Sequence, residues 1–408
     1  MEQHPKSTGL KLVQVEMLVY DDKLELAEKL LNELYAIEPT NEEIYIQKAN
    51  ICSKRDQHEK AVELLKTALK YTDDYADVYN LIGMEYLFMD NLEKAKENFI
   101  KCLEEDLEDQ SALYNVVYCF EFLDQNQEAI AYLNKYIDKN PYSEIAWHQL
   151  GRLHYGVKEY ENAIRAFEYA TLIDEEFLGA FMEKAKAYER LKKYDEAIES
   201  YSRTIELDDA TSYALLRMGK CYEKLGNKAL ALKHFNQTVH EDPLLDKGWI
   251  AITDFYVRQK NYQKALFFVN KALAIDNQNH LYWKRYASIN KQMNFFEEAE
   301  FGYRKAVEFG ETGLETWLFW VDILQFLGEF ESAIQTLLQA SEYFPEENEV
   351  EYRLAGLYFM LTQNTKAKFH LSNALRLNFD NHIILEDLFP AVWTKKMVQN
   401  YIAKHKKQ

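Results

Sequence analysis

The chain has 408 residues, of which 48% are hydrophobic and 28% charged, and its formal net charge is −19. The hydrophobic content excludes a disordered chain, and the acidic balance disfavours nonspecific binding to DNA or RNA. The four cysteines stand far apart in the sequence and include no CxxC pair. They therefore predict reduced thiols rather than a local metal site.

Targeting and membrane signals are absent from the sequence. No basic segment followed by an apolar core occurs at the N-terminus, and no run of 18 apolar residues occurs anywhere. We therefore expect neither a secretory signal nor a membrane span. A cytoplasmic protein is the simplest expectation, and the Tyr-, Asn-, Lys- and Glu-rich composition favours a bacterial source.

An alanine recurs every 34 residues along nearly the whole chain. The series has eleven members without insertion or deletion: Ala27, Ala61, Ala95, Ala129, Ala163, Ala197, Ala231, Ala265, Ala299, Ala333 and Ala367. A fixed period of this length predicts a stack of paired helices. With the alanine at position 20, eleven repeats cover residues 8–381 and begin at residues 8, 42, 76, 110, 144, 178, 212, 246, 280, 314 and 348.

Other positions of the repeat also have a preferred size. In the repeat 144–177, large residues stand at positions 4 and 24 (Trp147 and Phe167), and small ones at positions 8 and 27 (Gly151 and Ala170). The spacings 4-7-8-11 and 20-24-27 each follow one face of an α-helix. Each repeat therefore predicts two amphipathic helices, A and B, in close contact. Prolines at position 32 predict the end of helix B: Pro39, Pro141, Pro243 and Pro345.

This pattern resembles the tetratricopeptide repeat family. The matching features are Trp or Tyr at position 4, Leu-Gly at 7–8, Tyr at 11, Ala at 20, Phe or Tyr at 24, Ala at 27 and Pro at 32. The resemblance implies an all-α fold, an α-solenoid in which antiparallel helix pairs form a right-handed superhelix. It also implies that helix A lines an inner groove, that the partners are peptides or proteins, and that the chain is not an enzyme.

The two ends depart from the repeat. Pro5 lies 34 residues before Pro39, so residues 1–7 are interpreted as the tail of a partial repeat. The next segment is apolar almost all round: Leu10, Leu12, Val13, Val15, Met17, Leu18 and Val19. Such a helix expects neighbours on every side. Three interpretations stay open: missing upstream repeats, a contact of this uncapped end with itself or a partner, or a frayed terminus.

At the other end, residues 382–408 predict a capping helix and a basic tail. Pro390 breaks the phase, and apolar residues then recur at helical spacing: Val392, Trp393, Met397, Val398, Tyr401 and Ile402. A helix lying on a membrane surface is the less favoured alternative, because the tail is short and the protein is acidic.

Catalytic signatures are missing. The sequence contains no phosphate-binding Gly-rich loop, nucleophile elbow, HExxH or EF-hand loop, and its histidines are scattered. We therefore predict no enzyme activity, no metal site and no cofactor.

Positions 2, 5, 9 and 12 of helix A line the groove that the resemblance implies. The candidate partner-binding residues at these positions are Asn80, Met84, Tyr114, Tyr118, His148, Arg152, Tyr155, Lys186, Lys220 and Lys284. Position 9 is basic in three successive repeats, at Arg152, Lys186 and Lys220. This order favours a peptide with an apolar part followed by acidic residues or a free carboxylate. Alternatively, the cations are ordinary helix formers that pair with Glu189 and Glu223.

Some members of the family clamp chaperone tails with Lys at position 5 and Asn at position 9 of one repeat. Here the repeat from 42 has Asn50 but Ile46, and the repeat from 280 has Lys284 but Ser288, so the clamp is incomplete. We predict a non-catalytic scaffold that binds a peptide or protein segment, and neither nucleic acid nor a membrane. One alternative is an assembly protein that forms homo-oligomers through its N-terminal end. RNA binding is a minor alternative.

Overall fold

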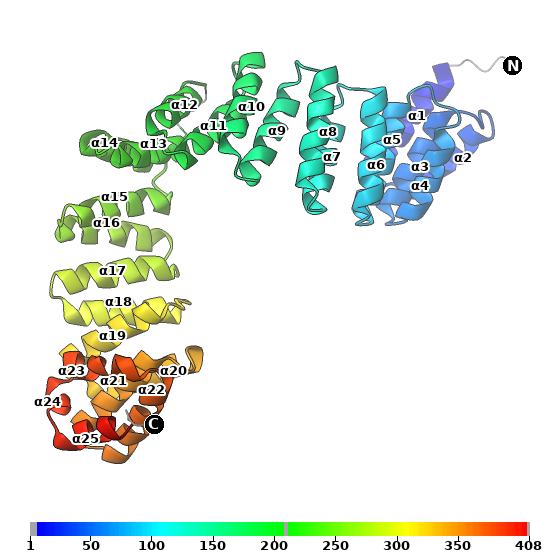
Figure 1. The fold of residues 1–408 in the computed structure, drawn as a ribbon. Coiled ribbons are helices and arrows are strands. Elements are labelled where there is room, and N and C mark those ends of the chain that lie inside the picture. Colours follow the sequence, from blue (N-terminus) through cyan, green and yellow to red (C-terminus); the bar gives the residue numbers. More distant parts are fainter. Residues whose placement is uncertain (1–5, 208–210, 406–408) are drawn as a thin grey trace. The chain divides into compact units, whose positions relative to one another are not determined.

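The computed structural model describes residues 6–207 and 211–405. All regular structure in these residues is helical, and none of it is a strand (Figure 1). The chain divides into two compact units, Met1–Asp209 and Ala210–Gln408, which we call the N-unit and the C-unit. Pro5, Lys406 and Lys407 lie outside the described residues.

The N-unit contains twelve described helices. They are α1 (Lys6–Tyr20), α2 (Leu24–Tyr35), α3 (Glu42–Lys54), α4 (His58–Ala68), α5 (Tyr75–Phe88), α6 (Leu92–Glu105), α7 (Gln110–Phe122), α8 (Asn126–Lys139), α9 (Glu144–Gly156), α10 (Tyr160–Ile173), α11 (Leu178–Arg190) and α12 (Tyr194–Leu207).

The C-unit continues with the same alternation of helices and ends in shorter ones. They are α13 (Ser212–Lys224), α14 (Lys228–Glu241), α15 (Asp246–Arg258), α16 (Tyr262–Ile275), α17 (His280–Gln292), α18 (Phe296–Glu308), α19 (Leu314–Phe326), α20 (Phe330–Tyr343), α21 (Asn348–Met360), α22 (Asn364–Leu377), the 3-10 helix η1 (Phe379–His382), α23 (Ile383–Leu388), α24 (Pro390–Trp393) and α25 (Lys396–His405).

Consecutive helices from α1 to α22 form antiparallel pairs, so the predicted all-α solenoid is confirmed. A residue with a left-handed backbone conformation (positive φ) follows the first helix of each pair. Such residues recur every 34 positions: Asp22, Asp56, Asp90, Asp124, Lys158, Lys192, Gly226, Lys260, Asn294, Gly328 and Thr362. At this position the chain reverses while its N–H groups satisfy the last helical carbonyls. In the turn after α5, for example, the N–H of Asn91 donates to Tyr86 O at 2.8 Å. The exact division into eleven repeats stays a prediction.

The contact between the two helices of a pair has the predicted small-against-large packing. All eleven alanines of the series are fully buried. A Cβ atom added to Gly151 on α9 would lie 2.5 Å from the ring of Phe167 on α10, and one on Gly219 would lie equally close to Phe235. The missing side chain at position 8 thus leaves room for the ring at position 24, because a packed interior has no spare volume.

The C-terminal segment forms several helices where the sequence predicted one. The helix that follows Pro390 breaks after Trp393, and α25 begins at Lys396. Val392, Val398 and Ile402 are all buried. Gln399 Nε2 donates to Trp393 O at 2.9 Å across the break. The interruption therefore lets both short helices place apolar residues against the last helix pair.

Candidate partner-binding surfaces

An exposed row of aromatic rings lies along α7 in the N-unit. It consists of Tyr114, Tyr118 and Phe122, four residues apart and all exposed, and we call it the aromatic row. The rings of Tyr118 and Phe122 are 4.3 Å apart between centroids. Two of these residues were predicted from positions 5 and 9 of the repeat, whereas Phe122, at position 13, was not. The row offers exposed aromatic surface to a partner.

Other predicted residues of the N-unit are engaged between helices. The amide of Asn80 on α5 donates to Asp109 Oδ2 and Ser111 Oγ, both at 2.8 Å. Met84 Sδ lies 3.5 Å from Asn115 Nδ2. These contacts join α5 to the segment that begins α7, so both residues help to hold neighbouring helix pairs together.

His148 on α9 is buried and packs against aromatic rings. Its ring centroid lies 4.8 Å from that of Phe177, and its Nε2 lies 3.3 Å from Glu183 Oε2 on α11. Burial would raise the pKa of Glu183, but the contact with His148 and the nearby charges of Arg152 and Lys186 hold it below its usual value. His148 therefore joins two helix pairs and is not open to a partner.

The predicted cations of the N-unit lie among groups of both signs. Arg152 on α9 donates to Gln149 Oε1 at 2.7 Å and lies 3.8 Å from Glu121 Oε2 on α7. Tyr155, one turn further along α9, accepts a hydrogen bond from Arg190 Nε at 3.0 Å. Arg152 is only half-buried, so its guanidinium retains donors that face solvent.

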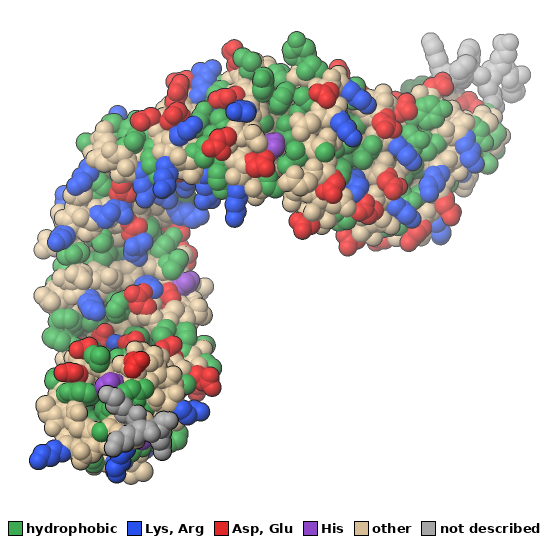
Figure 2. Space-filling model, viewed as in Figure 1, with side chains coloured by type: hydrophobic (Ala, Val, Ile, Leu, Met, Phe, Trp, Pro, Cys, Tyr) green, Lys and Arg blue, Asp and Glu red, His purple; other side chains and the backbone are tan. Residues whose placement is uncertain are grey.

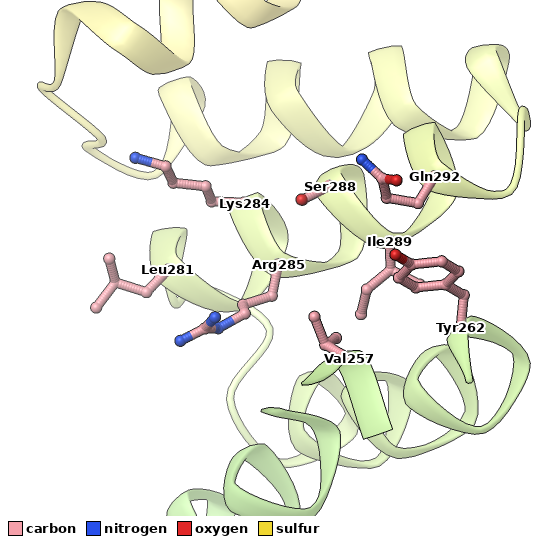
Figure 3. Close-up of a pocket in the computed structure, with 8 residues that line it drawn as sticks. All are labelled: Val257, Tyr262, Leu281, Lys284, Arg285, Ser288, Ile289 and Gln292. Atoms are coloured by element: carbon pink, nitrogen blue, oxygen red, sulfur yellow. The ribbon is translucent and has the colours of Figure 1, made fainter. Parts of the chain in front are cut away.

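The C-unit contains a cavity of about 350 Å³ beside α17, which we call the α17 pocket. Its lining residues are Val257, Tyr262, Leu281, Lys284, Arg285, Ser288, Ile289 and Gln292. Figure 3 shows that the two cationic side chains extend to one side of the pocket. The side chains of Val257, Ile289 and Tyr262 gather at the other end, together with the amide of Gln292, whereas Leu281 lies on the side of the two cations. The pocket therefore has a cationic end and an apolar end.

The two cations of the pocket have different surroundings. Arg285 Nη2 lies 3.0 Å from Asp254 Oδ2 on α15. Burial raises the pKa of the Asp254 carboxyl, although the charges of Arg285 and Arg258 oppose this shift. Lys284 Nζ is 3.8 Å from Glu311 Oε1, too far for a hydrogen bond.

Glu311 has closer partners than Lys284. The N–H of Gly313 donates to its Oε1 at 2.9 Å, and His280 Nδ1 lies 3.2 Å from its Oε2. Burial alone would raise the pKa of Glu311, but these two donors, followed by the charge of Lys284, hold it below its usual value. The carboxylate is satisfied without Lys284, so the ammonium group of Lys284 can turn to a ligand.

Of the pocket residues, the sequence predicted only Lys284. Leu281 and Ser288 stand at positions 2 and 9 of the same helix, so the groove rule could have identified them. Arg285, at position 6, belongs to the face that stacks on the preceding pair. Lys220 on α13 lies in the same unit, where its charge acts on Asp254. Glu223, its predicted partner, forms an ion pair with Arg258.

Acidic and basic side chains are interspersed on the visible faces of both units (Figure 2). Several ion pairs join one helix pair to the next, as between Arg353 on α21 and Asp322 on α19. No described helix is long and apolar enough to cross a bilayer. Within the described residues, no group of three or more His, Cys, Asp and Glu side chains is arranged to hold a metal ion.

Sequence models described as tetratricopeptide repeat match residues 18–84, 76–109, 111–143, 148–210 and 182–246. Together these matches cover more than half of the 408 residues. The chain belongs to the tetratricopeptide repeat family. A tetratricopeptide repeat protein is typically a non-catalytic protein-interaction scaffold, and this membership supports that role here.

One similar protein is anaphase-promoting complex subunit 3 of Schizosaccharomyces pombe. It is 26% identical to this tetratricopeptide repeat chain over 157 residues, which are 38% of this chain and 24% of the relative. The chain thus matches about a quarter of the relative's length.

Solved tetratricopeptide repeat structures are also similar. MamA is 23% identical over 40% of this chain and 95% of its own, with a TM-score of 0.36. One chain of the Cut9–Hcn1 hetero-tetramer of the anaphase-promoting complex is 14% identical over 86% of this chain and 83% of its own, with a TM-score of 0.41. YrrB, a repeat protein with an unusual peptide-binding site, is 22% identical over 45% of this chain and 95% of its own, with a TM-score of 0.35.

Proposed function

We propose that the protein is a scaffold whose α17 pocket binds a segment of a protein partner with a carboxylate beside an aliphatic side chain. The observation on which this proposal rests is the division of the pocket into a cationic end and an apolar end. The partner's carboxylate lies at Lys284 and Arg285, and its apolar side chain lies against Val257 and Ile289.

Charge supports this orientation. Lys284 is the loosest partner of Glu311, so turning it toward an incoming carboxylate leaves Glu311 with its Gly313 and His280 contacts. The hydroxyl of Ser288, one turn further along α17, adds a neutral donor. Hydrogen bonds to charged groups contribute about 1.5–3 kcal/mol each.

The shape of the other end supports a small apolar side chain. Val257 and Ile289 line it with aliphatic carbon, and Tyr262 closes it with a ring. Burying one aliphatic side chain there contributes about 1.5–3 kcal/mol. The carboxylate and the apolar side chain together are enough for a micromolar dissociation constant only if the partner segment is already extended and loses little conformational entropy on binding.

In the N-unit, the aromatic row and Arg152 are further parts of this proposal. Tyr114 and Tyr118 are exposed and offer stacking area, and Arg152 keeps free donors. The roles of Tyr155, Lys186 and Lys220, the cytoplasmic address and the bacterial source stay predictions.

Peptide binding tests the pocket directly. Two synthetic peptide pools are compared by fluorescence polarisation with the full chain: one with Glu next to Leu, the other with Gln in place of Glu. We expect the Glu pool to bind about tenfold more tightly. Lys284→Glu removes this preference because it places a negative charge at the cationic end.

The matched control is Lys271→Glu. Lys271 is an exposed lysine on α16 outside the pocket, so the same charge change there leaves the preference intact. If both variants bind the two pools alike, or if the wild-type chain shows no preference for Glu, the pocket does not bind a carboxylate and the proposal is wrong.

A further inference from the structure

The first helix presents a row of uncovered apolar side chains. Leu10, Val13, Met17 and Tyr20 on α1 are 73%, 51%, 66% and 87% exposed. Leu12, Val15 and Val19 on the opposite side are buried against α2 and α3. We call the exposed row the α1 outer face. It is uncharged and as apolar as the buried side of the same helix.

In later helices, the same face is a stacking interface. The α1 outer face corresponds to positions 3, 6, 10 and 13 of the repeat; position 13 stays exposed in later helices, as at Phe88 and Phe122, so the comparison rests on the other three. Position 3 is buried in the five A helices that follow in the N-unit, at Ile44, Val78, Ala112, Ala146 and Ala180. In the C-unit, a Cβ atom on Gly248, also at position 3, would lie 2.8 Å from Val239 of the preceding helix. Position 6 also faces the preceding pair, because Asn115, at this position of α7, contacts Met84 on α5.

At positions 3, 6 and 10, the α1 outer face therefore continues an interface that the following pairs of the N-unit use. Within each unit, a preceding helix pair packs against this face of the next helix A. An apolar face of this kind that stays in water costs the free energy that its burial would release, about 25 cal/mol per Å². Terminal repeats normally avoid this cost with a polar outer face.

We propose that a second copy of this chain covers the α1 outer face, with the two α1 helices antiparallel about a two-fold axis. This surface is separate from the α17 pocket. The spacing of its four residues, 3-4-3, reads the same in both directions. A two-fold axis at the level of residue 15 places Leu10 opposite Tyr20 of the second copy, and Val13 opposite Met17 of the second copy. Antiparallel helices with apolar residues at this spacing pack knobs into holes.

Charge also favours a second copy at this place. The whole chain has a net charge of −19, whereas the charged residues of α1 are only Lys6, Lys11 and Glu16. Two copies can meet here without the repulsion that acidic surfaces would produce. Glu16 borders the outer face, and the two-fold axis brings both copies of it to the same side. Neutralising Glu16 should therefore tighten the association.

The first test measures the molecular mass of the full chain by light scattering across a concentration series. We expect a concentration-dependent dimer. Leu10→Asp should weaken dimerisation at least about tenfold, because it places two charges in the apolar seam. Leu172→Asp is the matched control, because Leu172 on α10 is also 73% exposed. A monomeric wild-type chain, or equal loss in both variants, overturns the proposal.

The second test examines the antiparallel register. In a Cys52→Ser background, which removes the half-buried thiol, Val13→Cys and Met17→Cys chains are mixed and oxidised. The proposed axis predicts a disulfide between the two different chains. A mixture of Leu172→Cys with Met17→Cys should give none. Efficient cross-linking of Leu10→Cys to itself would contradict this register.

Discussion

The first and the last helix A of the array differ in how much of their apolar surface is covered. α1 and α21 are the first and the last helix A, and both are apolar on nearly every side. On α21, every residue from 352 to 359 is buried, because the short helices α23 and α24 pack against it. On α1, the outer face stays exposed among the described residues. The C-terminal end is thus closed from within the chain, whereas the N-terminal end has the composition of an interior helix and no described cover.

The closure of the C-terminal end depends on one ring. Phe389 is buried and lies over Gly356 of α21, where an added Cβ would be 2.3 Å from the ring. Phe389→Ala should lower the free energy of unfolding of the C-unit by about 3 kcal/mol, since it leaves a cavity above α21. Urea titrations followed by tryptophan fluorescence can measure this, because Trp317 and Trp320 belong to the same core. Phe369→Ala, at an exposed ring, should change stability little; equal loss in both variants would mean that Phe389 does not close this end.

A smaller effect is expected on α1, where the two sides of one helix can be compared. Val15 is fully buried, and Val13 is half exposed. Val15→Ala should cost about 2 kcal/mol, the transfer energy of two methyl groups with a small cavity. Val13→Ala should cost less than about 0.5 kcal/mol in the dilute monomer. Hydrogen exchange of residues 6–20, read by mass spectrometry, measures both. Equal protection losses would show that the two sides of α1 are buried alike.

Next in size is a hydrogen bond that fastens the C-terminal segment to α21. The buried Tyr352 hydroxyl donates to Asn378 O at 2.7 Å. Burial, with the nearby Asp380, raises the pKa of this phenol well above its usual value, so the group stays neutral and donating. Tyr352→Phe should cost about 1 kcal/mol. The tryptophan-monitored urea midpoint should fall while the m-value stays constant; an unchanged midpoint would show that the bond adds no net stability.

The smallest expected effect compares the left-handed turn at the two ends. Thr362 has φ 58°, and Asp22, at the same position of the first pair, has φ 59°. A β-branched residue is strained in this region, whereas Asp tolerates it. Thr362→Gly should therefore stabilise the C-unit by about 0.5 kcal/mol, and Asp22→Gly should change the N-unit by only a few tenths. A loss of stability in Thr362→Gly would mean that the threonine makes compensating contacts.

The helix pairs and the packing within each pair could be predicted from the sequence alone. A strict 34-residue period of small and large residues predicts a contact between the two helices of each repeat. Ala163 and Phe167 could therefore be placed in the core from the sequence alone. The apolar run from Leu10 to Val19 also predicted a helix that expects neighbours on every side.

Which side chains are available to a partner, by contrast, depends on how neighbouring helix pairs pack together. Position in the repeat predicted the groove residues Asn80 and His148 equally with Tyr118. Asn80 and His148 are nevertheless engaged by residues of the next pair, about 30 positions away, and Tyr118 is not. The same distance in sequence separates Arg285 from Asp254, and that contact helps to form the α17 pocket. A helical period is a local property, whereas the accessibility of a side chain depends on which residue the stacked neighbour places opposite it.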